Sequence, residues 1–305
     1  MSTETPPELF ADVDLSWEKT KNRIFYGVLI AASLFGVVML ILLFADILYE
    51  AVIGQQRFDI ELGRFLGNVG SQTPANAGFY SAIVASVWLM LFTVLFTFFI
   101  GVGAAIYLVE YAPDNRITRL IEANLANLAG VPSVVYGILI LALVVNGAGL
   151  GSVILAGSLA LALLVVPIII VASIESIRAV PDGMRDGSAA AGATKWQTIR
   201  RVTLPQAFPG IMTGTILAMA RAIGETAPLL MVGALFTDTS VPGGPLDSFS
   251  SMPVQIYNWT FLPQREFHAL AAMGIIVLLV VLFAMQAVAV YIRRTYENDV
   301  TIKGV

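Results

Sequence analysis

The sequence lacks cysteine and contains a single histidine, His268. Without cysteine the chain has no disulfide bonds and no thiolate metal ligands. One histidine gives little basis for a histidine metal site or for acid–base catalysis. Charged residues are also scarce, at 12% of the chain, about half of their share in an average soluble domain. We therefore expect neither catalytic residues nor a metal site.

Apolar residues, in contrast, are in excess. They make up 57% of the chain, and the mean hydropathy is +0.83. A soluble core cannot bury that much apolar surface, whereas lipid can. Because a transmembrane helix needs about 20 mostly apolar residues, the pattern predicts an all-α membrane protein with about six transmembrane helices, at 24–49, 79–109, 119–145, 150–177, 207–236 and 268–293.

The basic residues predict the orientation of these helices. Thirteen of the 17 lysine and arginine residues fall on one side when the spans alternate, three fall on the other side, and Arg221 lies within a span. Cytoplasmic loops carry the excess of positive charge. Both termini are therefore predicted to be cytoplasmic, in a multi-pass protein of the cell membrane. The acidic N-terminal tail does not have the pattern of a cleavable signal peptide.

The predicted domain organisation follows from the spans. Residues 1–23 form a cytoplasmic tail, and 24–78 hold the first transmembrane helix and an external loop. Residues 79–293 form the main transmembrane domain, and 294–305 form a second cytoplasmic tail.

The predicted cytoplasmic segment 178–206 has its own pattern. It predicts a short helix, a break at Gly192 and a second short helix, with Pro205 marking a break before the next span because proline lacks an amide donor. Trp196 lies on an apolar stripe of the second helix, beside a basic face. The segment is either a surface element that lies on lipid headgroups or a docking element for a cytoplasmic partner.

A charged pair interrupts the fifth predicted span. Arg221 and Glu225 are four residues apart, so they share a helical face and can neutralise each other. A charge at bilayer depth costs several kcal/mol, so the pair should face protein or a watery path. One reading is an ion pair that fixes helix packing. The other is an anion pathway, because the arginine fork suits a tetrahedral oxyanion, and Glu225 would then favour a protonated anion over a full dianion.

The cytoplasmic segment resembles the loop motif of ABC importer permeases. That motif usually has Glu-Ala-Ala, a glycine several residues later and Leu-Pro before the next span. Here Asp-Gly-Ser stands at the start, and Gly187 should loosen the helix by about 1 kcal/mol relative to alanine. The resemblance implies a type I ABC importer permease fold, with a coupling loop at about 182–203 that contacts an ATPase subunit through Arg185, Asp186, Gly187, Ser188, Gly192, Trp196, Leu204 and Pro205.

The charged segment narrows the resemblance further. Arg-x-x-Gly-Glu-Thr-Ala-Pro at 221–228 closely resembles the phosphate-specific branch of these permeases, and its Ala-Pro ending resembles the PstA type rather than the PstC type. The strings at 103–113 and 127–137 agree with this branch, so the resemblance covers about 79–293. It implies that Arg221, Glu225 and Thr226 line a path for phosphate.

The resemblance also implies partners. These are a PstC-type permease subunit, two copies of an ATPase subunit, an extracytoplasmic phosphate-binding protein and membrane lipid, but no nucleic acid. The chain has no Gly-x-x-x-x-Gly-Lys-[Ser/Thr] string for binding ATP. We therefore expect no cofactor in this chain, no catalytic or metal-binding residues, and ATP and Mg bound by the partner ATPase.

Three alternatives stay open at this point. The chain could be a permease for another oxyanion, such as phosphonate, sulfate or molybdate. It could be a secondary carrier that uses no ATPase. It could also be a purely structural membrane subunit, although such a subunit does not explain an ion pair within a span.

Overall fold

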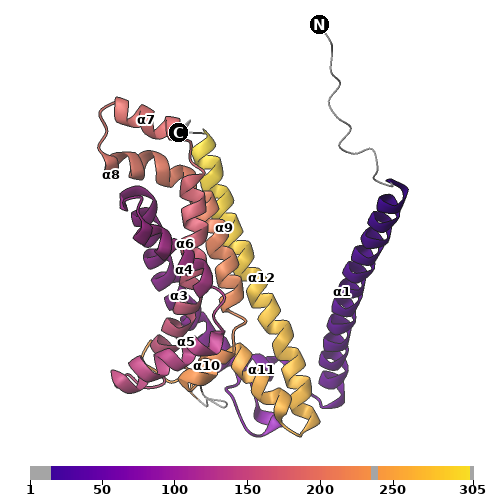
Figure 1. Ribbon diagram of the computed structural model, residues 1–305. Coiled ribbons are helices and arrows are strands. Elements are labelled where there is room, and N and C mark those ends of the chain that lie inside the picture. The colour runs from indigo at the N-terminus through magenta and orange to yellow at the C-terminus, as the bar shows by residue number, and fades with distance from the viewer. Residues whose placement is uncertain (1–14, 235–239, 303–305) are drawn as a thin grey trace. The chain divides into compact units, whose positions relative to one another are not determined.

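A computed structural model describes residues 15–234 and 240–302. These residues are almost entirely helical, with one isolated bridge between Val153 and Ser248. Figure 1 shows their elements, which are α1 (Leu15–Arg57), α2 (Leu62–Gly67), η1 (Pro74–Asn76), α3 (Tyr80–Ile106), η2 (Tyr107–Tyr111), α4 (Arg116–Leu128), α5 (Ser133–Ile140), η3 (Leu141–Gly147), α6 (Ile154–Arg178), α7 (Asp182–Ala190), α8 (Lys195–Thr198), η4 (Ile199–Thr203), α9 (Leu204–Ala222), α10 (Ala227–Val232), α11 (Met252–Phe261) and α12 (Arg265–Ile302). The elements η2, η3 and η4 are π-helical.

The structure divides into two compact units, with the boundary between Tyr49 and Glu50, inside α1. In the first unit, nearly all of the side chains from Trp17 to Tyr49 are exposed, and most of them are apolar. A helix that is apolar all round is stable only when lipid or other helices surround it. This unit therefore has the surface of a lone transmembrane helix.

Four helices in the described part of the chain are long and apolar enough to cross a membrane. They are Trp17–Arg57, Tyr80–Tyr111, Ile154–Arg178 and Arg265–Tyr296, and the bent pair of α4 and α5 raises the number to five. They contain or largely overlap the predicted spans at 24–49, 79–109, 150–177 and 268–293. At 119–145 and 207–236, by contrast, the structure has interrupted helices in place of the continuous spans that the sequence predicts.

The third predicted span is bent by 103° between α4 and α5. The break lies at 129–132, where Pro132 cannot donate a backbone hydrogen bond and α5 starts afresh after it. Across the bend, the Tyr136 hydroxyl donates to the Leu128 carbonyl oxygen at 2.7 Å. The same carbonyl, at the end of α4, also accepts from the Val131 amide at 3.0 Å, so the bend supplies the partners that a continuing helix would have given it.

The fifth predicted span is also broken. Helix α9 ends at Ala222, α10 begins at Ala227, and Gly233 then adopts a left-handed φ of 96°. The end of the prediction, at 235–236, lies outside the described residues. Pro228 explains the restart, because proline fits the first turn of a helix but not its interior. With 19 residues, α9 is not among the spanning candidates because of its polar residues.

The core of the second unit holds α3, α6 and α9 in close contact. A Cβ atom on Gly101 of α3 would stand 2.7 Å from Cγ2 of Ile169, so only glycine allows this approach to α6. Helix α6 also meets α9, where Ala172 lies against Gly214. Small residues let the backbones of neighbouring helices approach closely in membrane proteins. Helix α6 therefore packs closely against both α3 and α9.

Aromatic side chains tie residues 50–79 to this core. The rings of Phe65 and Phe79 are stacked 5.5 Å apart, and the Phe79 ring lies 5.5 Å from that of Trp259 in α11. Trp259 in turn lies 6.3 Å from Phe267 of α12. All four side chains are buried. This cluster fixes α2, α11 and the start of α12 at one end of the unit.

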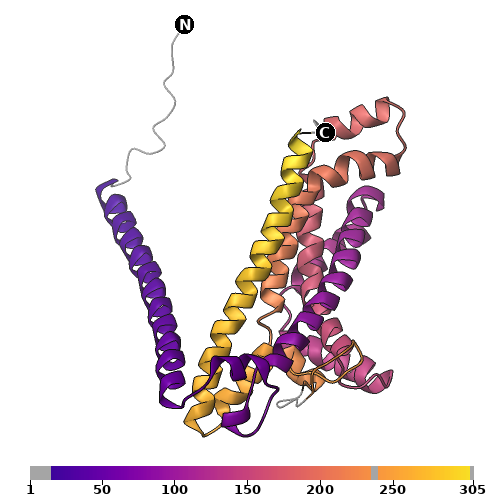
Figure 2. The same ribbon diagram turned by 180° about the vertical axis from the view of Figure 1, so that it is seen from behind.

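Helices α7 and α8 lie at the opposite end of the second unit, beside the C-terminal end of α12 (Figures 1 and 2). The predicted short helix, break at Gly192 and second short helix are confirmed, with a left-handed φ of 82° at Gly192. The predicted break at Pro205 is wrong. The π-helical η4 leads directly into α9, and the Leu204 amide donates to the Ile199 carbonyl. This wider bonding keeps the chain helical up to Pro205, which has no amide hydrogen to donate. The cytoplasmic orientation of this end stays a prediction.

Candidate functional site

The predicted Arg221–Glu225 ion pair lies where α9 breaks. Nε of Arg221 is 3.4 Å from Oε1 of Glu225, and the two side chains are 43% and 19% exposed. Arg221 belongs to the last turn of α9, while Glu225 lies in the break that follows. Within the described residues, Arg221 forms no other ion pair. Its guanidinium therefore keeps donors free for a further anion.

Two short turns hold this break in place. The Gly224 amide donates to the Arg221 carbonyl, and the Glu225 amide donates to the Ala222 carbonyl, each at 3.2 Å. Ala222 and Ile223 are buried, so they anchor the break on the core while Gly224 is exposed. The backbone thus turns Arg221 and Glu225 outward together.

Thr226 directly precedes α10. Its carbonyl oxygen accepts from the Leu230 amide at 3.0 Å, but its side chain makes no capping hydrogen bond. The residue is half-buried. All three predicted pathway residues are therefore close along the chain at one helix break.

The structure brings two of the singled-out strings together. A Cβ atom on Gly137 would stand 2.6 Å from the Pro228 carbonyl oxygen and 2.7 Å from the Pro228 Cα. Gly137 lies in α5 and Pro228 in the first turn of α10. The Ala-Pro ending of the charged segment therefore packs directly on the string 127–137, a contact that sequence reasoning did not foresee.

Tyr136 is a residue that sequence reasoning missed. It is buried in α5, next to Gly137, which packs on Pro228. Its hydroxyl is held by the Leu128 carbonyl. The sequence indicates this residue only indirectly, because it precedes Gly137, against which α10 packs closely. Tyr136 therefore links the bend between α4 and α5 to the contact of Gly137 with Pro228.

The residues of the predicted coupling loop divide into exposed and supporting groups. Asp186, Gly187 and Trp196 are exposed. The Ser188 hydroxyl lies 2.9 Å from the hydroxyl of Thr198, the last residue of α8, and so joins α7 to the end of α8. The remaining predicted residues shape the backbone or begin α9, and they are Gly192, Leu204 and Pro205.

Arg185, which is also among the residues predicted for the coupling loop, is partly buried and turned inward. It pairs with Glu110 at the end of η2 and with Asp182 in its own helix. The pair with Glu110 joins residues 75 positions apart, which a local pattern does not reveal.

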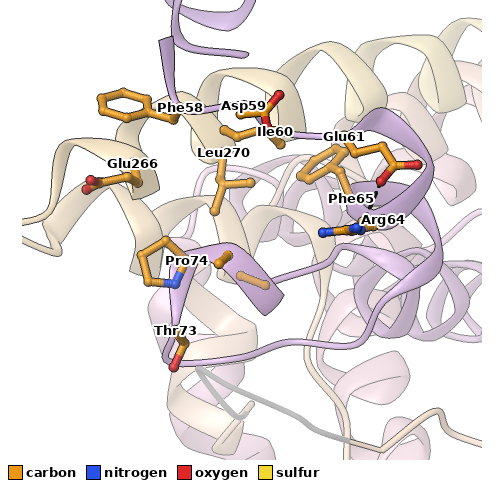
Figure 3. A pocket seen from close by; sticks show the side chains of 12 residues that line it. Phe58, Asp59, Ile60, Glu61, Arg64, Phe65, Thr73, Pro74, Glu266 and Leu270 are labelled. Atoms are coloured by element: carbon orange, nitrogen blue, oxygen red, sulfur yellow. Dashed lines mark ion pairs between the residues drawn. The ribbon is translucent and has the colours of Figure 1, made fainter. Parts of the chain in front are cut away.

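A half-open cavity of about 510 Å³ lies far along the chain from Arg221, between residues 58–77 and the start of α12 (Figure 3). Its charged side chains are Asp59, Glu61, Arg64 and Glu266, and Arg64 is bound to Glu61 at 2.9 Å. With three carboxylates and an engaged arginine, this cavity does not suit an anion. In the part of the chain that the structure describes, no group of three or more His, Asp or Glu side chains could hold a metal ion.

Comparison with known proteins identifies relatives among transport proteins. The chain is 31% identical to the phosphate transport system permease protein PstA of Yersinia pestis, over 92% of this chain and 93% of that protein. It is 31% identical to the probable ABC transporter permease protein YqgI of Bacillus subtilis, over 73% and 81%. It is also 41% identical to PstA 1 of Mycobacterium tuberculosis, strain H37Rv, over 44% and 43%.

Solved transporters share the fold. A chain of a bacterial alginate ABC transporter, in complex with an alginate-bound periplasmic protein, superposes with a TM-score of 0.64 at 14% identity, covering 92% of this chain and 97% of its own. A chain of the inward-facing MetNI methionine ABC transporter gives 0.59 at 18% identity, covering 70% and 94%. Both support the type I ABC importer permease fold.

The family described as "Binding-protein-dependent transport system inner membrane component" matches residues 98–297. This stretch includes the charged break, the bend between α4 and α5 and the whole of the predicted coupling loop. The chain therefore belongs to this family and is an inner-membrane permease component of an ABC importer.

Proposed function

We propose that the chain forms the translocation pathway for inorganic phosphate in an ATP-driven importer. The observation that carries this proposal is the half-exposed Arg221 at a helix break, paired only loosely with Glu225 at 3.4 Å. An arginine fork binds tetrahedral oxyanions through two parallel hydrogen bonds and stays charged when it is desolvated. Several relatives named as phosphate transport permeases support phosphate as the anion.

Glu225 sets the form of phosphate that this site would accept. Its carboxylate repels a full dianion but accepts a hydrogen bond from a protonated phosphate. Thr226 would supply a hydroxyl at the same break. The site would thus select an oxyanion that carries a proton, which sulfate at neutral pH does not.

The proposed partners follow from the family and the relatives. They are a PstC-type permease subunit, two ATPase subunits that bind ATP and Mg, and an extracytoplasmic phosphate-binding protein. The segment 182–203 would be the contact with the ATPase, because Asp186 and Trp196 are exposed there on two short helices.

Radiolabelled phosphate uptake into vesicles that contain the assembled complex tests the proposal. We expect uptake that requires ATP and that excess sulfate does not reduce. Competition by sulfate, phosphonate or molybdate, with little phosphate transported, would instead favour the alternative of another oxyanion. The alternative of a secondary carrier is dropped, because the chain belongs to a family of ABC importer permeases.

A further inference from the structure

The guanidinium of Arg185 contacts three parts of the permease. Nε lies 3.4 Å from Oε1 of Glu110 in η2, which continues α3, and one terminal nitrogen bonds to Oδ1 of Asp182 at 2.7 Å. The other terminal nitrogen donates to the Ile177 carbonyl in the last turn of α6, also at 2.7 Å. The Arg185 side chain is 21% exposed and that of Glu110 is 12% exposed. Arg185 therefore faces the permease and not the solvent.

Arg185 and Glu110 depend on each other. Nε of Arg185 and Oε1 of Glu110 are buried atoms, and in the described part of the chain neither has a hydrogen-bond partner. The ion pair thus compensates the charge of Glu110, whereas Arg185 also pairs with Asp182. Removing Arg185 would therefore leave Glu110 as an uncompensated buried charge, which is strongly unfavourable.

The bond to Ile177 fixes α7 to α6. Carbonyl groups at a helix C-terminus carry a partial negative charge, which a nearby cation stabilises. Only residues 179–181 separate the two helices. With its arginine held by both α6 and the end of α3, α7 cannot turn without moving those two helices.

From there, a continuous packed route leads to the charged break. Helix α6 contacts α3 at Gly101 and α9 at Gly214, both in places too tight for a larger residue. Helix α9 then ends at the turn that contains Arg221. Energetic coupling over such distances travels through rigid helices and packed side chains. The route runs from Arg185 through α6 to Arg221.

The residues on either side of Arg185 in α7 are exposed to solvent. Met184 and Asp186 are exposed on α7, and Trp196 of α8 is 54% exposed. The outward face of α7 and α8 is thus left for a partner. Arg185 occupies the inward face of the same helix.

We propose that Arg185 is a positioning residue that transmits movement of α7 to α3 and α6 through Glu110 and the Ile177 carbonyl. It does not contact the ATPase. The inference rests on the proposed coupling role of residues 182–203, and it assigns the two faces of α7 to two tasks. The outer face receives the partner, and Arg185 carries the motion inward.

The first test separates ATP hydrolysis from uptake in the assembled complex. We expect Arg185→Gln to assemble and hydrolyse ATP while the amount of substrate taken up per ATP falls about tenfold, within the usual range of coupling between sites. Glu110→Gln should do the same, and the double variant should be no worse than either single variant, because both act through one contact. The matched control is Arg119→Gln, which removes an exposed pair with Asp114 and should leave the ratio unchanged.

The second test does not depend on the substrate. The chain has no cysteine, and Gly224 is exposed next to Glu225, where a side chain meets ordinary contact only. The rate of thiol modification of Gly224→Cys, measured with and without ATP, therefore reports whether ATP changes the exposure of the helix break. We expect the nucleotide dependence to be lost on adding Arg185→Gln, even if phosphate is not the transported ion.

Retention of the full nucleotide dependence in Arg185→Gln would overturn the inference. Should that variant fail to assemble, Glu110→Gln serves instead, because it leaves Arg185 and its other two bonds in place. Loss of the dependence in Glu110→Gln supports the inference, and its retention contradicts it. A further outcome is that the unaltered complex fails to take up phosphate while Gly224→Cys still responds to ATP. That result would contradict the proposed substrate and leave the role of Arg185 standing.

Discussion

The backbone of Pro228 lies against Gly137, so closely that a Cβ atom on the glycine would stand 2.6 Å from the proline carbonyl oxygen. This contact joins α5, beyond the bend of the third predicted span, to α10, beyond the break of the fifth. The two interrupted helices thus support each other beside Arg221. The segments that follow the two interruptions, α5 and α10, therefore pack on each other.

Gly137→Ala tests this contact. Because the added methyl group would overlap backbone that cannot rotate away, we expect a loss of about 1–3 kcal/mol in the free energy of unfolding, as for other overpacked sites. Thermal unfolding of the purified complex measures it. Gly103→Ala is the control, since no atom lies within 4 Å of that position and alanine favours a helix. Equal stability of the two variants would contradict the contact.

Glu225→Gln tests the selection of a protonated anion. The amide keeps the size of the side chain but removes the negative charge that lies 3.4 Å from Arg221. We expect sulfate to become an effective competitor of phosphate uptake, because its second charge is no longer repelled. Uptake in the presence of graded sulfate measures this. If sulfate competes equally poorly with the variant and the unaltered chain, Glu225 does not select.

Gly192→Ala tests the turn between α7 and α8. No atom lies near this glycine, but its φ of 82° is strained for alanine, at about 1–2 kcal/mol. We expect a lower yield of complex with the ATPase and slower ATP-driven uptake. Gly183→Ala, which also has open space but lies inside α7, should preserve or improve both. Similar losses in both variants would mean that φ is not the cause.

Tyr136→Phe removes the hydroxyl that bridges the bend but keeps the ring. The lost hydrogen bond to the Leu128 carbonyl should cost about 1 kcal/mol, seen as a lower unfolding temperature of the complex. Selectivity between phosphate and sulfate should not change, because the charges of Arg221 and Glu225 stay in place. A change in selectivity with unaltered stability would assign Tyr136 to the pathway itself.

Much of this fold could be predicted from the sequence. The long apolar runs of α1, α3, α6 and α12 predict their helices, because hydropathy over about 20 residues is decisive in a membrane. The break at Gly192 was also readable, since glycine is the residue that adopts a left-handed φ without strain. Proline was harder to interpret. Pro132 and Pro228 follow real breaks, but the wider bonding of η4 absorbs Pro205 into a helix.

The candidate site was predictable only in part. Arg221 and Glu225 stand out because charges are rare within apolar runs. The contact of Gly137 with Pro228, and that of Glu110 with Arg185, join residues more than 70 positions apart. Such pairs depend on how helices pack, which local periodicity does not contain. The contacts around the site therefore had to come from the structure.

The most direct measurement of the central claim is ATP-driven uptake of radiolabelled phosphate by Arg221→Ala and Arg119→Ala complexes of equal yield. Arg119 lies in an exposed ion pair with Asp114 at the start of α4, away from the charged break. If Arg221 binds the transported anion, its loss should reduce uptake at least about tenfold, as expected for a charged hydrogen bond, while Arg119→Ala stays near the unaltered rate. Full uptake by Arg221→Ala would contradict the account.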